Sequence, residues 1–102
     1  MSKQANYKII DVGNVNLRCQ VTGKAHAPWV TVAHSLATDM SMWEPQLSEL
    51  GEHFQVLSFD ARGHGGSSCP NGPSVMIDLI DDVLLLWDRL SIDHSHFIGL
   101  SM

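Results

Sequence analysis

The chain alternates between two kinds of segment, and this alternation limits the fold more than any other feature of its sequence. Three short, nearly continuous apolar runs, at residues 29–33, 54–59 and 96–98, are typical of strands that are buried on both faces of a sheet. Two longer segments between them, at residues 41–52 and 75–90, have apolar side chains at helical spacing. Strands that alternate with helices of this length predict an α/β fold with a mostly parallel sheet.

An antiparallel hairpin is predicted at the start of the chain. Residues 7–12 are rich in strand formers, and residues 15–22 alternate between apolar and polar side chains, so that every second side chain faces the core. Gly13 and Asn14 between the two runs suit a tight turn that needs positive φ. The apolar side chains on the inner face are those of Val15, Leu17, Cys19 and Val21.

The two predicted helices differ in how clearly their beginnings are marked. Residues 41–44 match a capping box, but Pro45 would remove the first hydrogen bond of a helix that begins there. We therefore expect the first helix to start nearer Trp43. The second helix has an apolar stripe formed by Met76, Ile80, Val83, Trp87 and Leu90, which is widened by Leu79, Leu84 and Leu86.

Length and composition exclude several classes of protein. The 102 residues make one small domain at most, and six Lys and Arg against eleven Asp and Glu give a net charge of −5, which disfavours a nucleic-acid partner. The longest apolar run, at residues 83–87, is far short of the roughly 20 residues that span a bilayer. The first residues contain no visible secretory signal. Cys19 and Cys69 form no CxxC pair, so we expect reduced thiols in a cytoplasmic protein.

Chemistry in such a fold is expected at the carboxyl ends of the parallel strands, in the loops after Ala33, Asp60 and Ile98. The last four residues, Gly99-Leu100-Ser101-Met102, follow an apolar run and match the first four positions of a G-x-S-x-G elbow. This elbow turns a strand sharply into a helix and exposes a serine. The N–H of the next residue then points at the oxyanion that develops when the serine attacks a carbonyl.

The two earlier loops also carry features of a site. The loop after Ala33 begins with His34, whose ring we expect to bond backbone groups. The loop at residues 60–67 is rich in glycine, which permits close approach of the backbone. We expect the charged side chains of Asp60 and Arg62 to pair with each other and to shape this turn.

In this order and at this spacing, three motifs resemble the N-terminal part of the α/β-hydrolase fold. They are the His34-Ser35-Leu36 loop, the D-x-R-G-H-G-x-S turn at residues 60–67 and the Gly99-x-Ser101-Met102 elbow. Within that family, residues 35–43 and the elbow are similar to the 3-oxoadipate enol-lactonases. The resemblance implies that residues 1–102 are the incomplete, N-terminal portion of one α/β-hydrolase domain, with an antiparallel hairpin followed by parallel strands and alternating helices.

The resemblance also implies roles for particular residues. Ser101 would be the nucleophile, the backbone N–H groups of Leu36 and Met102 would form the oxyanion hole, and His34 and Ser35 would contact the substrate. The acid and the histidine of the triad follow the serine in this family, so we expect residues 1–102 alone to be inactive. The reaction would be hydrolysis of a lactone or carboxylic ester, without cofactor or metal. For the lactonases the substrate is 3-oxoadipate enol-lactone, in the breakdown of aromatic compounds.

The match has departures from the family pattern. Ser35 and Ala37 stand where the wider family commonly has glycine, and His34 stands where the lactonases often have asparagine.

Other functions stay open. The protein could be a general carboxylesterase, a peptidase-like relative or a non-catalytic binding domain with the same fold. A nucleotide site is disfavoured, because residues 63–68 end in Ser68 where G-x-G-x-x-G needs glycine. A metal site at His94 and His96 is disfavoured, because no third ligand has suitable spacing. The sequence leaves the oligomeric state unknown.

Overall fold

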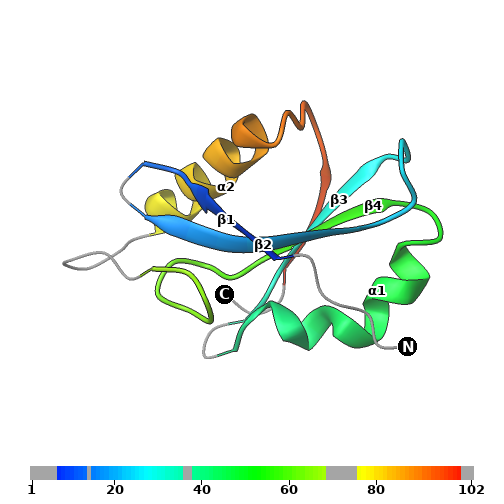
Figure 1. Ribbon diagram of the computed structural model, residues 1–102, viewed down its shortest axis with the longest axis horizontal. Coiled ribbons are helices and arrows are strands. Elements are labelled where there is room, and N and C mark those ends of the chain that lie inside the picture. Colours follow the sequence, from blue (N-terminus) through cyan, green and yellow to red (C-terminus); the bar gives the residue numbers. More distant parts are fainter. Residues whose placement is uncertain (1–6, 14, 36–37, 69–75, 100–102) are drawn as a thin grey trace.

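The strands form one mixed sheet in the order β1-β2-β4-β3-β5 (Figure 1). The computed structural model describes residues 7–13, 15–35, 38–68 and 76–99. β1 (Tyr7–Asp11) pairs antiparallel with β2 (Asn16–Gly23), which pairs antiparallel with β4 (Gln55–Phe59). β3 (Trp29–Ala33) lies parallel between β4 and β5 (His96–Gly99). The predicted α/β fold, with a hairpin followed by parallel strands, is therefore confirmed.

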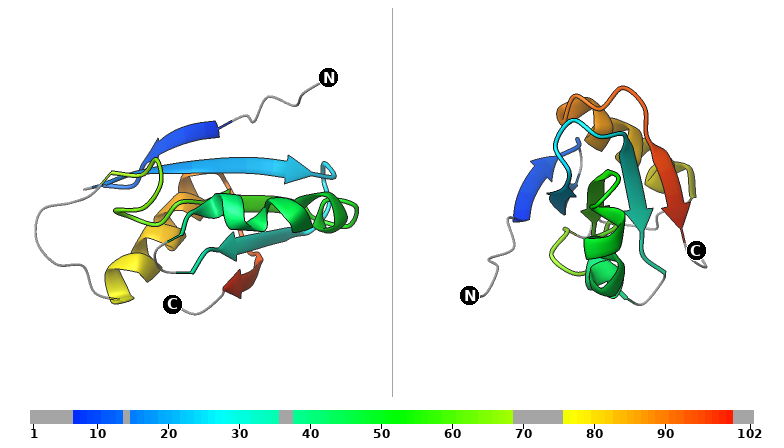
Figure 2. Two further views of the ribbon diagram at one scale, coloured as in Figure 1. Left: turned by 90° about the horizontal axis from the view of Figure 1, so that it is seen from below. Right: turned by 90° about the vertical axis from the view of Figure 1, so that its right-hand side faces the viewer.

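The helical segments cover opposite faces of this sheet (Figure 2). The 3-10 helix η1 (Met40–Trp43) and helix α1 (Glu44–Leu50) connect β3 to β4, and α2 (Met76–Arg89) connects β4 to β5. Side chains alternate between the two faces along each strand. One face packs Val30, Val32 and Val56 against Trp43, and the other packs Ala33, Leu57 and Phe59 against Val83 and Leu86.

β5 differs from the expectation of a strand buried on both faces. Its four residues are exposed, with Phe97 at 51% and Ile98 at 38% of their full accessible surface. β5 pairs with β3 along one edge, and within the described residues no strand pairs with its other edge. The strand predicted at residues 96–98 is therefore confirmed, whereas its predicted burial on both faces is wrong.

The first helical segment begins with a different cap from the predicted one. Asp39, rather than Ser41, precedes η1, and its carboxylate accepts the Ser41 N–H at 2.9 Å. Hydrogen bonds from the Ser41 side chain and backbone lower the pKa of Asp39. Pro45 lies in the first turn of α1, where a missing N–H breaks no helical bond. The predicted capping box at 41–44 is therefore wrong, and the expected start near Trp43 agrees with α1.

α2 turns a slightly different face to the sheet from the predicted stripe. Val83 and Leu86 are buried as expected, whereas Ile80 and Leu84 are 47% and 52% exposed. The buried face also includes the charged side chain of Asp82. No helix in the described part of the chain is long and apolar enough to cross a membrane.

Asp82 lies on the buried face of α2 and forms an ion pair with the buried side chain of Arg62. Arg62 donates from Nε to Asp82 Oδ2 at 2.7 Å and from Nη2 to Oδ1 at 2.8 Å. The hydrogen bonds to Asp82 raise the pKa of Arg62. The expected pairing of Asp60 with Arg62 is therefore wrong, since each bonds a partner from another segment; both still have the structural role that we expected.

We predict that Asp82→Asn lowers the free energy of unfolding by about 3 kcal/mol, because it removes the charged carboxylate that bonds the buried Arg62 guanidinium at two nitrogens. Urea titration followed by circular dichroism measures this loss. Asp88→Asn is the matched control, because Asp88 and its partner Arg89 are 75% and 46% exposed at 3.6 Å. That variant should change stability by less than about 0.5 kcal/mol. Equal losses of unfolding free energy in the two variants would contradict a stabilising role for the buried ion pair of Asp82 and Arg62.

Candidate functional site

The parallel strands β3, β4 and β5 end at the same edge of the sheet. Ala33, the last residue of β3, pairs with Phe59 at the end of β4 and with Gly99 at the end of β5. The carboxyl ends of these three strands therefore lie side by side, as the parallel arrangement predicts. We call this region the carboxyl edge.

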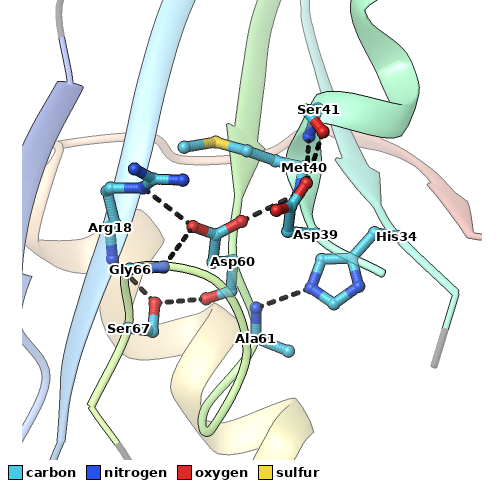
Figure 3. Close-up of polar contacts among 9 residues, drawn as sticks. All are labelled: Arg18, His34, Asp39, Met40, Ser41, Asp60, Ala61, Gly66 and Ser67. Carbon is cyan, nitrogen blue, oxygen red and sulfur yellow. Dashed lines mark hydrogen bonds and ion pairs between the residues drawn. The ribbon is translucent and has the colours of Figure 1, made fainter. Parts of the chain in front are cut away.

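The Asp60 carboxylate is the centre of the hydrogen bonds at the carboxyl edge (Figure 3). Its Oδ1 accepts the Met40 N–H at 2.8 Å, and its Oδ2 accepts the Gly66 N–H at 2.9 Å and Arg18 Nε at 2.8 Å. The side chain is fully buried. Gly65 has φ +51, and a Cβ there would collide with the carboxylate, so the close approach requires glycine. Asp60 thereby joins β2, η1 and the loop at 61–68.

The loop at 61–68 is also attached to β2 through Ser67. The Ser67 hydroxyl donates to the Asp60 carbonyl at 2.6 Å and accepts the Arg18 N–H at 2.8 Å. The Arg18 guanidinium stacks on the Tyr7 ring, 4.6 Å from its centroid. Sequence reasoning missed Arg18, because it lies in the middle of an alternating strand and its partner lies 42 residues further along the chain.

His34 connects the loop after β3 to the end of β4. Its side chain is buried, with 1% of the residue's surface exposed. Nε2 lies 2.9 Å from the Ala61 nitrogen, whose N–H donates to it, and Nδ1 lies 2.8 Å from the Ser35 carbonyl oxygen. The expectation that this ring bonds backbone groups is confirmed. Its predicted contact with substrate stays a prediction.

Ser35 lies next to His34 and is held by groups that follow it in the chain. Its N–H donates to Met42 Sδ at 3.3 Å, and its carbonyl oxygen accepts the Thr38 hydroxyl at 2.6 Å. The residue is partly exposed at the carboxyl edge. Its proposed contact with substrate is likewise an untested prediction.

His64 lies beside His34 across the carboxyl edge. The two ring centroids are 5.1 Å apart, with the planes tilted by 52°. His64 Nδ1 is 3.0 Å from the Arg62 carbonyl oxygen. The predicted nucleophile Ser101 and the predicted oxyanion donors Leu36 and Met102 lie outside the described residues, so no distance relates His64 to them.

An apolar cavity of about 430 Å³ lies between α2 and the sheet, and it reaches the carboxyl edge. Ala33, Phe59 and Ala61 contribute its wall at that edge, and Phe97 and Trp87 contribute walls from β5 and α2. A cavity of this size and composition suits an apolar group.

Cys19 is buried in the same core and is unsuited to be a nucleophile. Burial raises the pKa of its thiol to about 11, despite the opposing effect of Lys8. Among the described residues, no group of three or more His, Cys, Asp or Glu side chains is arranged to hold a metal ion. Cys69 lies outside the described residues.

The comparisons with known proteins agree with this geometry. Residues 28–102 match the alpha/beta hydrolase fold family, and the chain belongs to that family. The crystal structure of the enol-lactonase from Burkholderia xenovorans superposes with a TM-score of 0.90 at 44% identity, covering 93% of this chain and 37% of that one. The fold inferred from the motifs is thus confirmed.

Two curated relatives with the names of hydrolytic enzymes also match most of the chain. The 3-oxoadipate enol-lactonase 1 of Acinetobacter baylyi is 35% identical over 102 residues, which are 100% of this chain and 38% of the lactonase. The 2-(acetamidomethylene)succinate hydrolase of Mesorhizobium japonicum is 28% identical over 93 residues, covering 91% of this chain and 33% of that hydrolase. The chain therefore spans about a third of the length of these relatives and matches their N-terminal part.

We predict that the Cys19 thiol reacts with Ellman's reagent at pH 8 more than about a hundredfold more slowly in the folded protein than in urea, because the raised pKa leaves little thiolate. The rate is measured by absorbance in a Cys69→Ser variant, so that only Cys19 reports. Rapid reaction without denaturant would contradict the burial.

We further predict that Asp60→Asn lowers the free energy of unfolding by about 2–4 kcal/mol. The carboxylate accepts hydrogen bonds from backbone N–H groups in a buried site. The amide of asparagine would place an NH₂ group, which is itself a donor, against one of them. Asp39→Asn is the control, since asparagine caps helices as well as aspartate and the expected change is within about 0.5 kcal/mol. Urea titration compares the two, and an undiminished stability in Asp60→Asn would show that the carboxylate is dispensable.

Proposed function

We propose that the protein carrying this chain is a serine hydrolase that cleaves a lactone or carboxylic ester with Ser101 as the nucleophile. The supporting observation is the register of β3 and β5. Gly99, the first residue of the elbow motif, pairs with Ala33, which precedes the predicted oxyanion loop. In the sequence, Ser101 follows Gly99 at the end of β5 by two residues, and Leu36 follows Ala33 at the end of β3 by three. The described residues that begin the two motifs, His34 and Gly99, therefore lie at the same edge of the sheet, which supports the proposal.

The proposed reaction uses these groups in sequence. Ser101 Oγ attacks the carbonyl carbon while a histidine from the later part of the enzyme takes its proton. The N–H groups of Leu36 and Met102 stabilise the oxyanion, and each such donor contributes about 3 kcal/mol to lowering the barrier. Collapse breaks the carbon–oxygen bond of the lactone or ester, and the leaving oxygen receives the proton from the histidine. Water then hydrolyses the acyl-enzyme by the same steps.

We propose 3-oxoadipate enol-lactone as the substrate, in the breakdown of aromatic compounds in the cytoplasm. The similarity to two enol-lactonases of Acinetobacter baylyi, at 35% and 38% identity, supports this choice. The apolar cavity beside the carboxyl edge could accept the carbon skeleton of a small substrate. Cofactor and metal have no step in the proposed mechanism, and neither does a nucleic acid.

A second candidate is a hydrolase of another small acyl compound. The similarity to 2-(acetamidomethylene)succinate hydrolase favours it, since the name of that relative describes a substrate other than the enol-lactone. The predicted alternatives of a general carboxylesterase or a peptidase-like enzyme belong to this candidate. Relative kcat/KM values on the enol-lactone, simple esters and amides distinguish it from the first.

We predict that the whole protein reacts with a fluorophosphonate at Ser101, since the activated serine of such enzymes attacks the phosphorus of this probe and releases fluoride. Ser101→Ala should abolish labelling and lower kcat for lactone or ester hydrolysis by more than about a thousandfold. Ser48→Ala, at an exposed position of α1, is the matched control and should leave both unchanged.

Labelling is located by mass spectrometry of peptides, and hydrolysis is followed by loss of substrate absorbance. A folded protein that is unlabelled and inactive on every acyl substrate would favour the non-catalytic binding domain. Retained activity in Ser101→Ala would overturn the proposed nucleophile.

A further inference from the structure

The sulfur of Met42 lies among polar groups of the loop after β3. The Ser35 N–H donates to Sδ at 3.3 Å, and the hydroxyls of Ser35 and Thr38 lie 3.8 Å and 3.5 Å from it. Met42 also packs against the apolar cluster that contains Trp43. Its sulfur is therefore at the boundary between this cluster and a polar loop.

A thioether is a poor partner for these polar groups. Its sulfur is a weak acceptor, whereas the Ser35 N–H is a strong donor that is partly buried and bonds Met42 Sδ. The Thr38 hydroxyl has one proton, which it directs to the Ser35 carbonyl oxygen at 2.6 Å rather than to the sulfur at 3.5 Å. The loop thus offers this sulfur more hydrogen-bonding capacity than a thioether uses.

Oxidation of the sulfur would supply the strong acceptor that these donors lack. In the reaction with a hydroperoxide, the sulfur lone pair forms the S–O bond and the O–O bond breaks. The proton of the transferred oxygen moves to the leaving oxygen, which departs as water or an alcohol. Sulfur is oxidised by two electrons and the peroxide is reduced by two, and the product is methionine sulfoxide. Its oxygen can accept the Ser35 N–H and a hydroxyl proton.

Exposure distinguishes Met42 from the methionine two residues before it. Met42 is partly exposed and Thr38 beside it is exposed, so a small oxidant can reach the sulfur. Met40 is only 3% exposed. We propose that Met42 is a site of reversible oxidation by hydroperoxides, at which Ser35 and Thr38 stabilise the sulfoxide. Methionine sulfoxide reductases convert this product back to the thioether.

The added oxygen changes the position of the loop. An acceptor oxygen lies about 2.9 Å from an N–H donor. An oxygen inserted between Met42 Sδ and the Ser35 nitrogen therefore separates these atoms beyond their present 3.3 Å. η1 is held by the bond from the Met40 N–H to the buried Asp60, so the displacement falls on Ser35. Ser35 is a predicted substrate contact, so oxidation lowers activity; this consequence rests on the proposed function.

The first experiment locates the oxidation in the whole folded protein. After treatment with hydrogen peroxide, the protein is unfolded and digested with trypsin, and the peptide of residues 25–62, which contains Met40 and Met42, is sequenced by mass spectrometry. We expect Met42 to gain one oxygen at least about tenfold faster than Met40, and the two rates to become equal in urea. Equal rates in the folded protein would overturn the proposed site.

Nuclear magnetic resonance tests the new hydrogen bond without any measurement of activity. The Ser35 amide proton should shift downfield and exchange more slowly with solvent after oxidation, because a sulfoxide oxygen is a stronger acceptor than a thioether sulfur. Treatment with methionine sulfoxide reductase should reverse both changes. An unchanged Ser35 resonance in protein oxidised at Met42 would overturn the stabilising role of the loop.

The second experiment measures kcat/KM of the whole protein on its best lactone or ester substrate before peroxide, after peroxide and after the reductase. We expect a loss of about tenfold that the reductase reverses, since small displacements near a substrate are costly. Met42→Leu, which has a similar volume, should keep kcat/KM within about threefold of the wild type and resist peroxide. Met40→Leu is the matched control and should remain sensitive.

The outcomes distinguish this inference from the proposed function. If Ser101→Ala retains activity, the proposed function fails, while the mass spectra and the Ser35 resonance still decide the oxidation site. If Met42 is oxidised selectively and the activity of the wild type is unchanged, the effect on activity is overturned. A loss of equal size in Met42→Leu would also overturn it. If Met42→Leu does not fold, loss and recovery in the wild type and in Met40→Leu decide.

Discussion

The arrangement of the carboxyl edge depends on the buried carboxylate of Asp60. A charge without water must be matched by donors, and Asp60 obtains them from Arg18 on β2 and from the N–H groups of Met40 and Gly66. Three segments are thereby held against the end of β4. The N–H of the next residue, Ala61, donates to His34, so the loop after β3 is attached to the end of the same strand, β4. The geometry proposed for catalysis thus begins with one satisfied charge.

Most of the fold could be predicted from the sequence, because it follows from local patterns. The alternation of apolar and polar side chains in β2 indicates a strand with one buried face, and the continuous apolar runs of β3 and β4 indicate strands buried on both faces. The burial of β5 could not be predicted in this way. A run such as His96–Gly99 specifies a strand, whereas its exposure depends on which other segments pack against it.

The candidate site could be predicted only in outline. The strand ends and the backbone-bonded ring of His34 followed from topology and residue type. The partners of Asp60 and Arg62 did not, because each acidic or basic group had several candidate partners and the chosen one came from a distant segment. Charge complementarity says that a buried ion needs a partner, and the packing of elements decides which one is near.

The pairing of Arg18 with Asp60 has a consequence for where the functional unit begins. The family match starts at residue 28, after the whole β1–β2 hairpin. A protein that begins at residue 28 would lack Arg18. Of the described donors to the buried Asp60 carboxylate, it would keep the N–H groups of Met40 and Gly66. The hairpin is therefore an integral support of the carboxyl edge, and the smallest piece of the chain that keeps this edge intact is longer than the segment that matches the family.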